Sequence, residues 1–175
     1  MDDAGERCGS ARKYLVHELI PSGEANDYLR RGELLESGPM IDAATLQSTF
    51  DGIAAEYVSR LHLRVASVNE ESVTIDFPVV PELVHAGGVL CGQAIMSVAD
   101  TAMLLAMMAR LGGFKPMTTV QLQTSFLRPV PKETPSVTVV ARVLRLGKTL
   151  SYGEVEFRTP DGKLAAHATT TYALI

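Results

Sequence analysis

After residue 60, six segments have the pattern of hydrophobic and polar positions that is typical of β-strands. In residues 61–68 the apolar Leu61, Leu63 and Val65 alternate with other residues, and a second extended run covers residues 72–79. The short connection at residues 69–71 predicts a hairpin between these two runs. Further extended runs cover residues 117–127, 137–146, 150–159 and 164–175, with turn signals at residues 147–148 and 160–162. The pattern therefore predicts six strands.

The segment between the second and third strands is different, because it is apolar on nearly all sides. It runs from about residue 90 to residue 111, is rich in Ala, Met and Leu, and ends at Gly112-Gly113. Such residues favour a helix, and glycine just past the end is a common helix stop. A helix without a polar face must be enclosed. We therefore expect an α+β domain in which an antiparallel sheet wraps around one long helix, in the order β-β-α-β-β-β-β.

The first part of the chain lacks this regularity. Residues 1–40 are polar and are interrupted by Pro and Gly, which predicts a loose extension with one or two short helices. Another short helix is predicted from Asp42 onward, although Gly52 weakens the expectation of a continuous element. We place the domain boundary between an N-terminal extension, residues 1–45, and the main domain, residues 46–175.

Composition narrows the class of protein. The chain has 175 residues, of which 46% are hydrophobic and 21% charged, as in a single globular domain. Its net charge is −4 and it has no basic run, which argues against a nucleic-acid partner. Cys8 and Cys91 form no CxxC motif and no cluster with metal-ligand spacing. We therefore predict a reducing, cytoplasmic location and no metal site.

The apolar segment is long enough to span a bilayer, so a membrane location must be weighed. Asp100 lies near the middle of residues 89–109, and a central Asp costs about 2.5–3.5 kcal/mol on insertion into a membrane. The first ten residues are polar and acidic, unlike a secretory signal. We therefore predict a buried core helix and no membrane association.

Three polar residues share one stripe of this helix. Gln93, Ser97 and Asp100 follow the spacing i, i+4 and i+7, which places them within about 60° of one another. The sequence contains no Lys or Arg between residues 65 and 109, so no local cation pairs with Asp100. A buried carboxylate is costly without a partner. Asp100 therefore has a partner in a distant segment or another subunit, or lines a cavity; an Asp with a purely structural hydrogen bond fits the pattern equally well.

Glycines surround the start of the helix. Gly87, Gly88 and Gly92 would let a ligand approach the backbone closely. The free N–H groups of the first turn and the helix dipole can stabilise an oxygen that gains negative charge. The glycines alone are also compatible with a role in shaping the loop.

The run from Gly88 to Gln93, followed by Asp100-Thr101-Ala102, resembles the motif G-x-x-H-G-G-x6-(D/E)-x-A of hotdog thioesterases. Those enzymes include the phenylacetic-acid-degradation, 4-hydroxybenzoyl-CoA and thioesterase superfamily member 2 types. Residues 119–129 resemble their next strand, and residues 146–150 resemble their hairpin. The resemblance covers about residues 60–175. It implies the hotdog fold, acyl-CoA thioesterase activity and a homo-oligomer, which we expect to be a homotetramer, with the active site at a dimer interface.

Carried over position by position, the resemblance assigns four catalytic residues. The catalytic carboxylate falls at Asp100, acting as nucleophile or general base, and the oxyanion-hole glycine falls at Gly92. The hydroxyl that positions the attacking water falls at Thr119, and the Asn that often orients the thioester is replaced by His85. The alternative for His85 is a loop histidine that faces solvent.

The same resemblance suggests residues for substrate binding. Gln93 and Ser97 would face the acyl-CoA substrate, and Arg128 and Lys148 are candidates to bind the CoA phosphates. No resident cofactor is implied, because CoA arrives as part of the substrate. Cys91 replaces the motif His and Gln93 the second motif Gly.

Two other functions fit parts of the sequence. Residues 88–93 faintly resemble the P-G-V-L-x-x-E segment of acyl-carrier-protein dehydratases, but Gln93 stands where that chemistry needs an acid. A non-catalytic acyl-CoA-binding protein is the other alternative, since a fold does not guarantee an activity. The presence of Asp100 argues against it.

Overall fold

The structure is a computed structural model that describes residues 34–175, which form one compact unit. The helices are α2 (Ala43–Ile53), α3 (Glu56–Ser59), the 3-10 helix η2 (Pro81–Leu83) and α4 (Gly92–Leu111). The strands are β1 (Arg64–Val68), β2 (Val73–Pro78), β3 (Met117–Phe126), β4 (Ser136–Leu146), β5 (Leu150–Arg158) and β6 (Leu164–Leu174).

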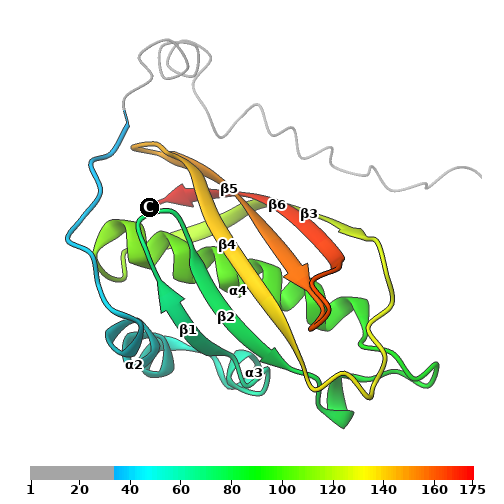
Figure 1. The fold of residues 1–175 in the computed structure, drawn as a ribbon. Helices are drawn as coiled ribbons and strands as arrows, with labels where there is room; N and C mark the ends of the chain where they lie inside the picture. Colours follow the sequence, from blue (N-terminus) through cyan, green and yellow to red (C-terminus); the bar gives the residue numbers. More distant parts are fainter. Residues whose placement is uncertain (1–33) are drawn as a thin grey trace, which may run out of the picture. The chain divides into compact units, whose positions relative to one another are not determined.

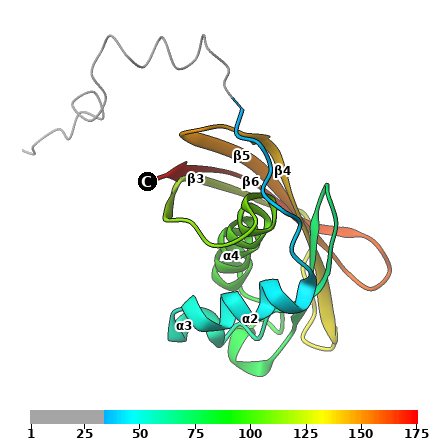
Figure 2. The ribbon, with the colours of Figure 1, turned by 90° about the vertical axis from the view of Figure 1, so that its left-hand side faces the viewer.

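The six strands form one antiparallel sheet in the order β1-β2-β4-β5-β6-β3. The sheet curves around α4, as Figure 1 shows from the side and Figure 2 along the helix. Helices α2 and α3 lie next to the part of α4 that the sheet leaves open (Figure 2). This is the hotdog fold, and the predicted element order β-β-α-β-β-β-β is confirmed.

Helix α4 supplies the centre of the hydrophobic core. Its buried residues lie on nearly every side and include Val98, Met103 and Met107. Gly112 ends the helix in the left-handed conformation, with φ of 72°, which favours glycine. Among the described residues, α4 is the one helix long and apolar enough to cross a membrane, but 72% of its most apolar window is buried inside the fold. It is therefore the core helix of the domain, as predicted.

The N-terminal side of the domain differs in detail from the sequence prediction. Helix α2 begins after Asp42, whose side chain accepts a hydrogen bond from the Thr45 N–H at 2.7 Å, and it continues through Gly52. Strand β1 begins at residue 64 rather than 61, because the backbone N–H groups of Leu61 and His62 still bond to the preceding turn. The predicted boundary after residue 45 falls within α2. The predicted helices before residue 34 lie outside the described residues.

Candidate active site

The carboxylate of Asp100 is the centre of a polar cluster contributed by three elements. Asp100 projects from α4 and is half-buried. Its Oδ1 accepts a hydrogen bond from Thr119 Oγ1 of β3 at 2.6 Å. The same Oδ1 accepts one from the hydroxyl of Tyr172, on β6, at 2.7 Å, and this hydroxyl also lies 2.8 Å from the Asp100 carbonyl oxygen. The sequence predicted that Asp100 has a partner in a distant segment or lines a cavity. In the structure its partners are two neutral hydrogen-bond donors, Thr119 and Tyr172.

Tyr172 acts in this cluster as a donor. Its side chain is buried, and this burial raises the pKa of the Tyr172 phenol well above its ordinary value. The nearby Thr119 hydroxyl opposes that rise in pKa, whereas the neighbouring Asp100 carboxylate adds to it. The phenol consequently keeps its proton throughout the pH range of a folded protein.

No cation within residues 34–175 pairs with Asp100. The ion pairs within residues 34–175 involve other carboxylates, namely those of Glu56, Glu154, Glu156 and Asp161. Both donors described above point at Oδ1, and among the described residues no donor bonds to Oδ2. A half-buried carboxylate therefore has one oxygen held by the protein and the other available to a ligand.

The amino end of α4 lies beside an open groove. No side chain caps the first turn of the helix, so its N–H groups are available to a ligand. The groove has a volume of about 290 Å³ and is mainly apolar. Its lining consists of Val89, Leu90, Gly92, Ile95, Phe126, Leu127, Arg128, Pro129 and Val130. A Cβ atom at Gly92 would lie 3.2 Å from Cζ of Phe126, so any larger residue there would crowd the groove.

The polar stripe of α4 continues beyond Asp100. Ser97 donates to the Gln93 carbonyl oxygen at 2.9 Å, and its hydroxyl lies 2.7 Å from that of Tyr57, on α3. Gln93 is exposed, and so is the neighbouring Met96. Gln93 and Ser97, which were predicted to face the substrate, therefore share the face of α4 that the sheet does not cover.

The other predicted residues lie farther from Asp100. His85 is exposed in the loop before α4, and its Nδ1 accepts a hydrogen bond from the Gly87 N–H at 2.9 Å; no hydrogen bond in the described part of the chain joins it to Asp100 or Thr119. Arg128 lines the groove and donates to the Leu164 carbonyl oxygen at 2.6 Å.

Lys148 and Arg128 do not form one cationic cluster within a protomer. Lys148 lies in the turn between β4 and β5, where its neighbour Thr149 bonds to Leu174 at the end of β6. Arg128 bonds to Leu164 at the beginning of that strand. The two ends of β6 are ten residues apart, and at about 3.3 Å per residue this is a distance of about 30 Å. Arg128 and Lys148 of one protomer are therefore too far apart to bind the same phosphate.

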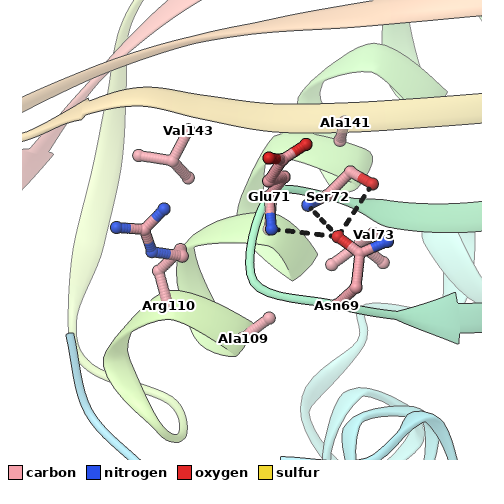
Figure 3. Close-up of a pocket in the computed structure, with 9 residues that line it drawn as sticks. Asn69, Glu71, Ser72, Val73, Ala109, Arg110, Ala141 and Val143 are labelled. Atoms are coloured by element: carbon pink, nitrogen blue, oxygen red, sulfur yellow. Dashed lines mark hydrogen bonds between the residues drawn. The ribbon is translucent and has the colours of Figure 1, made fainter. Parts of the chain in front are cut away.

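A second depression lies near the carboxyl end of α4, and it is a poorer candidate for a site. Figure 3 shows that Asn69, Glu71, Ser72 and Arg110 surround it. Asn69 Oδ1 accepts hydrogen bonds from the backbone N–H groups of Glu71 and Ser72 at 2.9 and 2.8 Å, which stabilise the hairpin turn (Figure 3). Its volume of about 10 Å³ accommodates about one water molecule.

Three further residues of the site could not be identified from the sequence, namely Tyr172, Tyr57 and Phe126. The alternation in residues 164–175 could have indicated that Tyr172, a polar residue, faces the core with Ala168 and Thr170. No local pattern marks Tyr57, whose contact with Ser97 depends on how α3 packs against α4.

The family of the chain follows from comparisons with known proteins. Residues 87–166 match the sequence profile of the thioesterase superfamily. The chain is 31% identical over 115 residues to a Saccharolobus solfataricus protein named provisionally as an esterase; the match covers 66% of this chain and 80% of that protein. The chain therefore belongs to the thioesterase superfamily of hotdog-fold hydrolases.

Solved structures agree on the fold. A Haemophilus influenzae thioesterase superposes with a TM-score of 0.70 at 23% identity, covering 81% of this chain and 95% of the other. The Escherichia coli PaaI protein, from the phenylacetic acid degradation operon, superposes with a TM-score of 0.63 at 18% identity, covering 76% and 95%. At these identities the similarity establishes the hotdog fold alone.

Proposed function

We propose that this protein is an acyl-CoA thioesterase, which hydrolyses a CoA thioester to a free acid and CoA, with Asp100 as its catalytic carboxylate. The observation that carries the proposal is the environment of Asp100. This half-buried carboxylate has no cationic partner in the described part of the chain, and two hydroxyl groups hold it through one oxygen. A folded protein gains little stability from such a group, whereas hydrolysis requires a carboxylate that is ionised and accessible.

Two routes use this carboxylate. As a general base, Asp100 takes a proton from water while the water oxygen bonds to the thioester carbonyl carbon. The tetrahedral intermediate then breaks its C–S bond, and the departing CoA thiolate takes the proton back from Asp100. As a nucleophile, Asp100 itself bonds to the carbonyl carbon and expels the thiolate, and water then cleaves the resulting anhydride.

Thr119 fits the general-base route. Its hydroxyl hydrogen is donated to Asp100, so its oxygen has lone pairs free to accept a hydrogen bond from the attacking water. The N–H of Gly92, at the positive end of α4, would stabilise the oxyanion.

One catalytic centre requires two subunits. Gly92 and Asp100 are eight residues apart on α4, which corresponds to about 12 Å along the helix. A thioester carbonyl cannot contact both residues of the same helix, because each must lie within about 3 Å of the reacting atoms. We therefore propose that the Gly92 of one subunit works with the Asp100 of another.

The edge strand β3 is the surface on which we expect the second copy. It pairs with β6 on one side only, and its Val120 side chain is 59% exposed. Pairing of two β3 strands would satisfy the open edge. A dimer of such dimers would give the homotetramer, and sedimentation equilibrium should yield an even multiple of the 18.8 kDa chain mass.

The remaining predicted residues complete the proposal. Gln93 and Ser97 would face the substrate on the open side of α4. Arg128 and Lys148 would bind CoA phosphates, and because they lie at opposite ends of β6 they would serve different centres or different subunits. A cytoplasmic location would supply the acyl-CoA.

The direct test is the release of free thiol from aromatic, medium-chain and long-chain acyl-CoAs by the wild-type protein and by Asp100→Asn. Turnover that depends on Asp100 would support the proposal, and the preferred acyl group would define the substrate. Tight binding of acyl-CoA without thiol release would contradict it and favour a binding protein instead.

Thr119 gives a further prediction. Thr119→Val removes the hydroxyl while keeping the shape of the side chain, and we expect kcat to fall by about 10- to 100-fold. Thr119→Ser should retain most of the activity, because it keeps the donor. Thr118→Val, an exposed position on the same strand, is the matched control. Equal activity of Thr119→Val and Thr118→Val would remove Thr119 from the mechanism.

A further inference from the structure

Tyr172 and Thr119 form a cross-strand pair that approaches one atom of Asp100. The two residues are directly paired in the register of β3 with β6, so their side chains leave the sheet side by side toward α4. Both hydroxyls donate to Oδ1, at 2.7 and 2.6 Å. Two strands of the sheet thus fix the same oxygen of a helix side chain.

Tyr172 is in turn fixed by its surroundings. Its side chain is only 4% exposed, and β6 is paired on both sides, with β3 at Thr119 and with β5 at Ser151. Its hydroxyl also lies 2.8 Å from the Asp100 carbonyl oxygen, so one phenol joins the main chain and the side chain of the same residue. This double contact restricts the rotation of the Asp100 side chain relative to its own backbone.

We infer that Tyr172 is a positioning residue of the hydrolytic site, which fixes Oδ1 of Asp100 and thereby leaves Oδ2 as the oxygen that reacts. The inference rests on the proposed function for the identity of the reaction. Oδ2 has no donor among the described residues, so its lone pairs are free for water or for the carbonyl carbon. Tyr172 acts through Asp100 and does not contact the substrate.

Loss of the phenol hydroxyl would leave Thr119 as the one described donor to Oδ1. The Asp100 side chain would then be held less firmly, and its reactive oxygen would spend less time in the productive position. Removal of the hydroxyl should therefore lower the rate of the reaction more than the binding of the substrate.

The test is Tyr172→Phe, which removes the hydroxyl and keeps the buried ring. With the best acyl-CoA substrate we expect kcat to fall by about 10-fold or more while KM changes less than about twofold. Tyr152→Phe, on β5 and exposed, is the matched control and should behave as wild type.

A second measurement does not depend on turnover. The carboxyl carbon resonance of Asp100 should be single and sharp in the wild type, and shifted or broadened in Tyr172→Phe, because the side chain then samples more than one rotamer. An unchanged resonance together with an unchanged kcat would overturn the inference. If the wild type hydrolyses no acyl-CoA, the proposed function fails, and the resonance alone decides whether Tyr172 positions Asp100.

Discussion

Asp100→Asn is expected to lower kcat for thiol release by about 100-fold or more, because an amide is neither a base nor a nucleophile. The two hydroxyl groups of Thr119 and Tyr172 can still donate to the amide oxygen, which would take the place of Oδ1. The NH2 group would then stand where the reactive oxygen was, with hydrogen atoms in place of lone pairs. The measurement is steady-state thiol release, and KM should change by less than about threefold.

The stability of the same variant distinguishes a catalytic Asp100 from a structural one. The half-buried carboxylate has no cationic partner among the described residues, so a neutral amide of the same size should leave the free energy of unfolding unchanged or raise it by up to about 1 kcal/mol. Urea unfolding of Asp100→Asn beside Asp76→Asn, on β2, measures this difference. A loss of activity together with a clear loss of stability would indicate that Asp100 is needed for the fold instead.

The fold was predictable from the sequence wherever local patterns determine it. Helix α4 is apolar on nearly all sides, and the predicted strands agree with β2 to β6 within about one residue at each end. The start of β1 was not predictable, because Leu61 and Leu63 are buried while the chain between them still turns, with φ of 54° at His62. The order of strands in the sheet also could not be predicted. Strand β3 pairs with β6, although β4 and β5 lie between them in the sequence, and no local pattern indicates such a pairing.

Of the candidate site, only the residues that belong to a sequence motif could be predicted. Asp100 and Thr119 follow from the resemblance, and the structure brings them within 2.6 Å of each other. Tyr172 follows Asp100 by 72 residues, and its role depends on the pairing of β6 with β3. The spacing of Gln93, Ser97 and Asp100 could be read from the sequence, but the contact of Ser97 with Tyr57 depends on tertiary packing.

Gly153 determines how closely the sheet approaches the helix that carries Asp100. It lies on the inner side of β5, where a Cβ atom would stand 2.5 Å from Sδ of Met103 and 2.5 Å from the Arg142 carbonyl oxygen. The Met103 side chain can move aside, whereas the carbonyl of Arg142 belongs to the backbone of β4 and cannot. Extra volume in such a place usually costs about 1–3 kcal/mol.

We therefore expect Gly153→Ala to lower the free energy of unfolding by about 2–3 kcal/mol, measured by urea titration. Gly52→Ala is the matched control, because a Cβ atom there meets nothing within 4 Å. An exposed helical Gly replaced by Ala should raise stability by about 0.5–1 kcal/mol. If Gly153→Ala is as stable as the wild type, the prediction is wrong, because β4 and β5 can then separate enough to accept the extra Cβ atom at no cost. Met103 follows Asp100 by three residues on α4, which is less than one helical turn, so a displaced α4 should also lower kcat.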